Sequence, residues 1–191
     1  LLFESVKAKG SFLDNKRVIV TAAPHQSGKD EYLMILMILA LDIDVCYLSA
    51  KWTMRRIPIP FIKPKDIDNQ GIPWPLGWLQ EIVFRKFGAI PVDRKGNSGQ
   101  YDSVVQELFK RDSFLLIITP EGRFDATRFR SSFLYLAKEL EAEVMPVQID
   151  YEHDTLQFLG SLNLDGSEDE VIQRLRFCFD GVKGRKSRFK A

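Results

Sequence analysis

The chain has 191 residues, of which 45% are hydrophobic and 28% are charged. This length and composition indicate one globular domain and exclude an intrinsically disordered chain. The formal net charge of +1 provides no global field for nucleic acid, so no nucleic-acid partner is expected. Cys46 and Cys178 lie far apart and form no metal-ligand spacing. They favour a reducing, cytoplasmic setting, although two cysteines also suffice for one disulfide.

Short apolar runs alternate along the chain with stretches of helical spacing. In chain order the pattern predicts a strand at 17–23, a helix at 28–41, a strand at 45–48, a helix at 74–87, a strand at 90–93 and a helix at 102–110. It then predicts a strand at 114–119, a helix at 133–140, strands at 144–150 and 155–159, and a helix at 169–179. The alternation indicates an α/β fold, with a mixed, mostly parallel sheet layered with helices in a single domain over residues 1–191.

The longest apolar stretch runs from Leu33 to Leu41 and covers nine residues. A membrane-spanning helix needs about 20 such residues, so this stretch predicts a buried helix instead. Prolines interrupt the pattern between residues 51 and 75, and a basic tail occupies residues 183–191. Such a tail is most often a solvated end, and in a minority of proteins it binds anionic lipid headgroups.

The first predicted strand runs directly into Pro24-His25-Gln26-Ser27-Gly28-Lys29-Asp30. Residues five apart in one helix point about 140° away from each other. His25 and Asp30 therefore meet only if His25 lies in the loop and Asp30 in the first helical turn, with Ser27 as a suitable N-cap. In such a pair, neutral imidazole accepts a proton from a hydroxyl while the carboxylate fixes its tautomer. Because no serine or cysteine is placed as a covalent nucleophile, the attacking hydroxyl belongs to the substrate, as in a transferase.

A structural interpretation competes with this one. Ser27 and Asp30 have the spacing of a variant capping box, in which Asp30 serves only the helix terminus. The Ser27-Gly28-Lys29 sequence does not form a phosphate-binding loop, because the glycine five residues before the Gly-Lys pair and the Ser or Thr after it are missing.

Two later strand ends carry arginines. The strand at 90–93 ends in Asp93-Arg94, which by itself is typical of an ordinary surface pair, although a guanidinium also suits phosphate. The strand at 114–119 runs into Pro120-Glu121-Gly122-Arg123, with Arg128 and Arg130 close behind. Gly122 permits unusual backbone angles at this turn. Pro146, in Val144-Met145-Pro146-Val147, predicts an edge or bulge position, and His153 is interpreted as a turn residue.

Aromatic and apolar residues mixed with basic ones are typical of the boundary between lipid headgroups and acyl chains. The mixture lies between residues 51 and 78, so a membrane surface is a predicted partner. The alternative is that these side chains pack the core or line an acyl pocket. The set comprises Trp52, Met54, Ile57, Pro58, Ile59, Phe61, Trp74 and Trp78 with Lys51, Arg55, Arg56, Lys63 and Lys65.

Taken in order, four clusters resemble the motifs of the glycerolipid acyltransferase family, which includes the short bacterial 1-acylglycerol-3-phosphate acyltransferases. That pattern is His-(four residues)-Asp, then Gly-x-x-x-Val/Ile-Asp-Arg, then Pro-Glu-Gly-Thr-Arg-Ser, then a Val-Pro-Val strand. The matching positions here are His25 to Asp30, Gly88 to Arg94, Pro120 to Arg123, and Val144 to Val147. The resemblance covers about residues 17–150, most of the chain.

The resemblance implies a glycerol-3-phosphate acyltransferase-like fold with His25 and Asp30 as the catalytic dyad. It implies that Arg94 and Arg123 contact an acceptor phosphate, and that Glu121 and Gly122 shape the acceptor pocket. The implied donor is acyl-CoA or acyl carrier protein, used as co-substrate with no cofactor and no metal. The implied acceptor is a lysophospholipid such as 1-acylglycerol-3-phosphate. The implied location is cytoplasmic and peripheral, on the inner face of the membrane.

The sequence departs from the family pattern at several positions. Arg123-Phe124-Asp125 replaces the usual Thr-Arg-Ser, Lys29 replaces an apolar or aromatic residue, and Gly28 replaces a residue that is often Asn. These changes leave the chemistry intact and keep an aminolipid or other non-phosphate acceptor open. Two other functions also stay open: a thioesterase or lipid hydrolase that uses the same His–Asp pair on water, and a non-catalytic module that binds lipid or acyl carrier.

Overall fold

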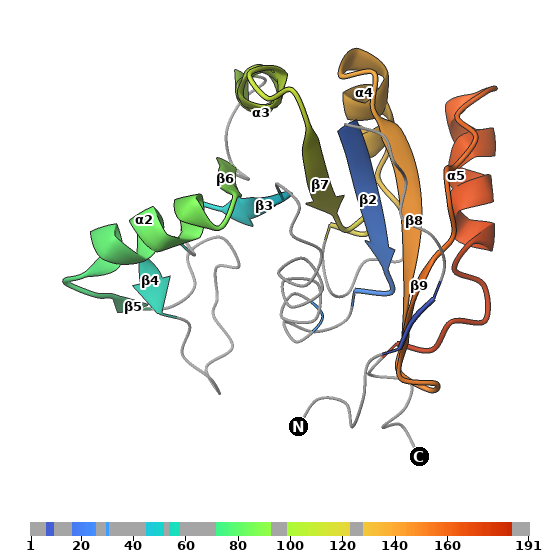
Figure 1. The fold of residues 1–191 in the computed structure, drawn as a ribbon, viewed down its shortest axis with the longest axis horizontal. Helices are drawn as coiled ribbons and strands as arrows, with labels where there is room; N and C mark the ends of the chain where they lie inside the picture. Colours follow the sequence, from blue (N-terminus) through green and yellow to red (C-terminus); the bar gives the residue numbers. More distant parts are fainter. Residues whose placement is uncertain are drawn as a thin grey trace. The chain divides into compact units, whose positions relative to one another are not determined.

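The computed structural model describes residues 7–9, 17–25, 30, 45–51, 54–57, 72–92, 99–122 and 128–184 (Figure 1). By their contacts the residues group into two compact units, one of residues 1–43 and 112–191 and the other of residues 44–111. The single domain expected from the sequence stays a prediction.

The first unit is built on a mixed, mostly parallel sheet. Its strands follow the order β1-β9-β8-β2-β7, and every neighbouring pair is parallel except β8 with β9. The elements are β1 (Lys7–Lys9), β2 (Arg17–Ala23), β7 (Phe114–Ile118), α4 (Ser132–Glu139), β8 (Glu143–Asp150), β9 (Thr155–Phe158) and α5 (Glu168–Phe177). In Figure 1, β7, β2 and β8 run side by side and α5 lies beside β8.

The central strands are buried along almost their whole length. In β2 only Arg17 is partly exposed, and β7 and β8 also bury most of their residues. Such unbroken apolar runs are typical of parallel strands covered on both faces. Helix α4 contributes Phe133 and Leu136 to the core, and α5 contributes Val171 and Leu175. The α/β class and these strands confirm the sequence prediction.

The second unit contains a parallel strand pair, a small hairpin and two helices. Strand β3 (Val45–Ala50) pairs in parallel with β6 (Ala89–Val92), and β4 (Arg56–Ile57) pairs with β5 (Ile72–Pro73) in antiparallel fashion. The helices are α2 (Gly77–Lys86) and α3 (Gly99–Phe109). The sequence predicts β3, β6 and both helices, but not β4 and β5, which have two residues each. The predicted helix at 28–41 lies outside the described residues, except for Asp30, which is helical.

Strand β8 lies between β2 and β9, but its pairing with β9 covers only Val147–Asp150, so Pro146 has a strand partner on the β2 side alone, which agrees with the predicted edge position. Pro146 is opposite Thr21 of β2, and its carbonyl accepts a hydrogen bond from the Leu159 N–H at 3.1 Å. The N–H and C=O of a strand residue point to the same side, so the N–H that proline lacks would point away from β2. On that side the pairing with β9 has already ended at Val147 opposite Phe158.

Cys46 and Cys178 do not form a disulfide; Cys46 is buried and Cys178 is half-buried. Within the described ranges, no helix is long and apolar enough to cross a membrane.

Candidate functional site

The site is assembled where three parallel strands of the first unit end. Thr21 of β2 lies opposite Ile118 of β7, and Ala23 of β2 lies opposite Gln148 of β8. Because the strands are parallel, the residues that follow each of them emerge at the same edge of the sheet. These are Pro24-His25 after β2, Thr119 to Gly122 after β7, and Tyr151 after β8. Strand register therefore brings together residues that lie about a hundred positions apart in sequence.

His25 and Asp30 face each other, as the sequence predicts. His25 is non-helical and Asp30 is helical, and His25 Nδ1 lies 3.6 Å from Asp30 Oδ2. Both side chains are buried, with 7% and 1% of their surface exposed. The separation is longer than a hydrogen bond, yet short enough for the Asp30 carboxylate to stabilise an imidazole that has taken up a proton. Catalytic hydrogen bonds are often long before substrate binds.

Tyr151 is the third member of this cluster, and sequence reasoning missed it. Its phenol donates a hydrogen bond to Asp30 Oδ1, so the two carboxylate oxygens of Asp30 face Tyr151 and His25 respectively. The Tyr151 side chain is buried, and its backbone N–H donates to the Lys183 carbonyl at 3.0 Å. No local motif marks Tyr151, since its place depends on the register between β2 and β8.

Glu121 connects the β7 end to the His25 loop. Its Oε1 accepts a hydrogen bond from the backbone N–H of His25 at 3.1 Å. Its Oε2 is buried and has no hydrogen-bond partner in the described part of the chain. Burial raises the pKa of Glu121; the hydrogen bond from His25 opposes this rise, and the charge of Asp30 adds to it. A ligand that brings a hydrogen-bond donor to Oε2 would remove this deficit.

Gly122 closes the turn after β7 in a conformation that favours glycine. Its φ is +66°, and its N–H donates to the Thr119 carbonyl at 2.9 Å. A Cβ at this position would lie 3.1 Å from Arg130 Nε, so the Arg130 side chain covers the turn. The Arg130 N–H also donates to the Pro120 carbonyl at 2.8 Å. The structure thus places an exposed arginine beside Glu121 that the sequence analysis noted only in passing.

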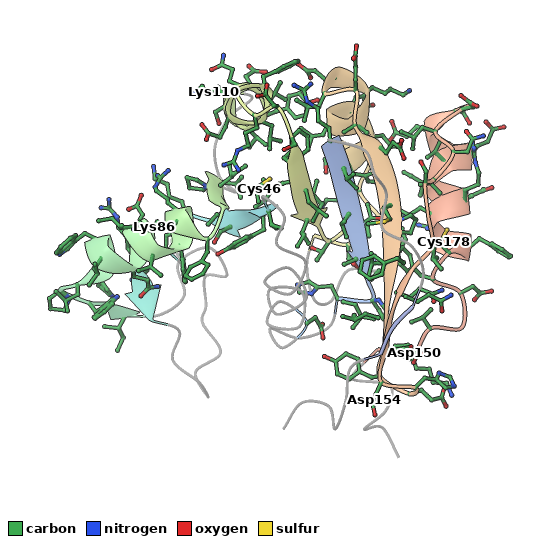
Figure 2. All side chains as sticks on the ribbon, viewed as in Figure 1. Cys46, Lys86, Lys110, Asp150, Asp154 and Cys178 are labelled. Carbon is green, nitrogen blue, oxygen red and sulfur yellow. The ribbon has the colours of Figure 1, made fainter. Side chains whose placement is uncertain are left out.

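Two of the predicted site residues, Arg94 and Arg123, lie outside the described residues, and so does the stretch from Gln26 to Lys29. His153 lies in the turn between β8 and β9, as predicted. It is 67% exposed, and its Nδ1 lies 2.6 Å from Asp150 Oδ2. Figure 2 labels Asp150 and Asp154, which flank this turn. His25 is therefore the buried histidine and His153 the exposed one.

The arrangement can hold a proton acceptor in place, since a buried imidazole is aligned by a carboxylate that is itself held by a phenol. Within the described residues, no group of three or more His, Cys, Asp and Glu side chains is arranged to hold a metal ion. No protein-family model matches this chain, and no curated protein matches it either.

Proposed function

We propose that the protein is an O-acyltransferase that moves a fatty acyl group from acyl-CoA or acyl carrier protein to the hydroxyl of a lysophospholipid, in phospholipid biosynthesis. The observation that supports it best is the buried pair of His25 and Asp30 at the converging strand ends, with 3.6 Å between Nδ1 and Oδ2. The order of the four sequence motifs supports the acyl-transfer chemistry. The proposed acceptor is 1-acylglycerol-3-phosphate or a lipid of similar size.

The proposed reaction is a direct transfer without an acyl-enzyme. The acceptor hydroxyl attacks the thioester carbonyl, and the His25 ring nitrogen that faces away from Asp30 takes the hydroxyl proton. The tetrahedral intermediate then collapses, the C–S bond breaks, and the proton passes from His25 to the departing thiolate. The products are an ester and a free thiol. Asp30 stabilises the imidazolium that forms between these two steps.

The remaining residues have roles in binding. Glu121 Oε2 is buried next to His25 and has no partner among the described residues, and the proposed role of this oxygen is to accept a hydrogen bond from the bound acceptor. Gly122 is proposed to shape the acceptor pocket together with Glu121, and Arg94 and Arg123 are the proposed phosphate contacts. An aminolipid acceptor fits the same carboxylate, because an ammonium group also donates hydrogen bonds. The proposed location is the inner face of the cytoplasmic membrane, as a peripheral protein.

A thiol-release assay tests the proposal. Acyl-CoA is supplied with and without lysophosphatidic acid, and the free thiol is measured. The chain offers a matched pair of variants, because it has only two histidines. The His25→Ala variant should lose acceptor-dependent release by about a thousandfold or more, as expected for a general base. The His153→Ala variant should retain it, since His153 is exposed in a turn.

The outcomes separate the alternatives. Release that does not depend on acceptor indicates a thioesterase instead. A His25→Ala enzyme with near-full acceptor-dependent release would contradict the assigned base. Absence of release with acyl-CoA leads to the same assay with acyl carrier protein donors and an aminolipid acceptor; absence there as well would contradict the transferase proposal.

A further inference from the structure

Helix α2 of the second unit has its polar and apolar faces reversed relative to an ordinary surface helix. A helix on a globular protein usually points its apolar stripe at the core and its polar residues at solvent. In α2 the buried residue is Gly77, and the half-buried ones are Gln80, Glu81 and Phe84. Two polar residues therefore belong to the side that faces the unit.

The inner face of α2 is fixed by specific polar contacts. Gln80 Oε1 accepts a hydrogen bond from Trp74 Nε1 at 2.8 Å, and Gln80 Nε2 donates to the Arg56 carbonyl at 3.3 Å. Glu81 pairs with both Arg55 and Arg85, and these guanidinium groups lower its pKa. The orientation of the helix within its unit thus follows from bonds that only this face can make.

Close packing at Gly77 supports the same orientation. A Cβ at this position would lie 2.7 Å from the Arg55 carbonyl oxygen, nearer than real Cβ atoms approach an oxygen. Only glycine allows α2 to begin this close to the Arg55 backbone. The opposite face is therefore held toward solvent.

The outer face of α2 is apolar. Its residues recur at spacings of three and four, which places them on one side of a helix. Each is between 41% and 57% exposed, together with two neighbours that precede the helix. The residues of this outer face are Trp78, Leu79, Ile82 and Val83, with Phe87 directly after the helix, and the preceding neighbours are Ile72 and Leu76. Contiguous exposed apolar side chains of this size mark an interaction surface.

We propose that the outer face of α2 docks onto an anionic lipid bilayer. Residues 44–111 contain eleven Lys and Arg against seven Asp and Glu, a formal net charge of +4, whereas the other unit carries 16 basic and 19 acidic residues. The positive charge thus belongs to the unit that presents the apolar face. A short helix with Trp, Leu and Ile on one side and basic residues among and beside them suits the interfacial zone of a membrane.

Three basic residues lie on or beside the outer face of α2. Lys86, labelled in Figure 2, is an exposed residue of α2 itself. By helical geometry it falls within the arc between Ile82 and Leu79, and its long stem allows the ammonium to reach outward past the apolar side chains. Arg55 and Arg85 are also exposed and share a single carboxylate, Glu81. The surface around the apolar face therefore keeps a positive charge.

The same charges argue against a second copy of the chain as the occupant. Pairing two outer faces would bring together two units that each carry a net charge of +4. Such like-charge contacts oppose association, whereas anionic headgroups are attracted to the positive charges.

Some residues that the sequence assigned to a membrane-facing set do not belong to the docking face. Met54 is buried in the core, and Trp74 is half-buried and bonded to Gln80.

This inference deepens the proposed function, on which it rests for the identity of the lipid substrate, but vesicle binding is measured without any turnover. The purified full chain is sedimented with vesicles of phosphatidylcholine alone and with vesicles that also contain phosphatidylglycerol. The wild type should bind the anionic vesicles. A Leu79→Asp, Ile82→Asp double variant should bind at least about tenfold more weakly, because two charges enter the apolar layer. Lys86→Gln should weaken binding to anionic vesicles by about fivefold.

The chain offers a control with equal chemistry at another place. Phe177 on α5 is 81% exposed, more than any residue of the docking face, and Phe177→Asp should bind vesicles like the wild type. Folding of each variant is checked by its circular dichroism and by activity on short-chain, water-soluble substrates, which should match the wild type.

Three results would overturn the inference. The first is a wild-type chain that does not bind anionic vesicles. The second is an equal loss of binding in Phe177→Asp and in the double variant. The third is a wild-type dimer, seen by light scattering, that becomes monomeric in the double variant while vesicle binding is unchanged, because the face then joins two copies. Vesicle binding by a chain without transferase activity would overturn the proposed function and support the docking face.

Discussion

The phenol of Tyr151 donates a hydrogen bond to Oδ1 of Asp30, whose other oxygen faces His25 Nδ1 at 3.6 Å. Rotation of the Asp30 side chain would break one of these two relationships. Tyr151 is in turn held by its own backbone bond to the Lys183 carbonyl. We infer that Tyr151 is a positioning residue, which acts on the reaction through Asp30 and His25.

Replacement of Tyr151 by phenylalanine should separate positioning from binding. The variant keeps the ring and removes the hydroxyl, so the buried Asp30 loses a donor. We expect kcat to fall about 10- to 100-fold, because a small misplacement of a catalytic group is enough for that loss. KM should change little, since the hydroxyl of Tyr151 is engaged with Asp30. The free energy of unfolding should fall by about 1–3 kcal/mol. Steady-state kinetics and urea unfolding measure these quantities.

Tyr135→Phe is the matched control. Tyr135 also donates its hydroxyl to a carboxylate, Glu168 Oε2, at 2.8 Å, but this pair is exposed and joins α4 to α5. The kinetics should be unchanged in this variant. If Tyr151→Phe were as active as Tyr135→Phe, the assignment of Tyr151 would be wrong.

Glu121→Gln should show a pH-dependent gain in stability together with a loss of activity. The folded-state pKa of Glu121 is raised by burial above the ordinary value of 4.5, so the folded wild type holds this proton more tightly than the unfolded chain does. Stability from this group is present below pH 4.5 and is lost as the pH rises through the folded-state pKa. The glutamine variant has no such loss. Its stability relative to wild type should therefore increase over that pH window and then level off.

Glu168, a glutamate on the surface, should show the opposite dependence of stability on pH. Hydrogen bonds from Tyr135 and Ser131 lower the pKa of Glu168. Its stabilising effect is therefore present above the ordinary pKa and is lost as the pH falls. Unfolding of wild type, Glu121→Gln and Glu168→Gln over a pH series compares the two slopes. A flat difference for Glu121→Gln would mean that its carboxylate does not sit in the buried, unpaired position described.

Sequence patterns were sufficient to predict the central strands and the arrangement of His25 and Asp30. Both follow from local chemistry: an unbroken apolar run such as that of β7 is recognisable as a buried strand, and a pair five residues apart meets only across a loop and a helix start. The contact of Tyr151 with Asp30 could not be predicted in this way. Tyr151 joins the pair only because β8 runs parallel to β2 in one particular register, which a single sequence does not determine.

The spacing of apolar residues along a helix also does not determine whether their common face points toward the protein or toward solvent. The spacing of Leu79, Ile82, Val83 and Phe87 predicts a helix with one apolar side, but period alone does not say which side faces the protein. The direction is decided by Gly77, Gln80 and Glu81. Their partners outside the helix are Arg55, Arg56 and Trp74. In the same way, the local edge position of Pro146 depends on where β9 stops pairing with β8.

Arg130→Ala should weaken binding of a phosphate-bearing acceptor. The Arg130 side chain covers Gly122, directly after Glu121, and it is exposed. A guanidinium there is suited to an acceptor phosphate. We expect KM for lysophosphatidic acid to rise about tenfold, with kcat and KM for acyl-CoA nearly unchanged. Arg128→Ala, a change at another exposed arginine of the same segment, is the control. Equal effects of both variants would indicate a general charge effect instead.

Gly77→Ala should destabilise the protein, although the replacement of glycine by alanine in a helix usually stabilises it. Alanine normally stabilises a helix by up to about 1 kcal/mol relative to glycine. At Gly77 the added Cβ would lie 2.7 Å from the Arg55 carbonyl oxygen, so α2 must shift. Overpacking of this kind destabilises by about 1–3 kcal/mol. Ile82→Ala, on the exposed face of the same helix, should be within about 0.5 kcal/mol of wild type. Urea unfolding checks both, and a stabilised Gly77→Ala chain would show that α2 does not approach Arg55 so closely.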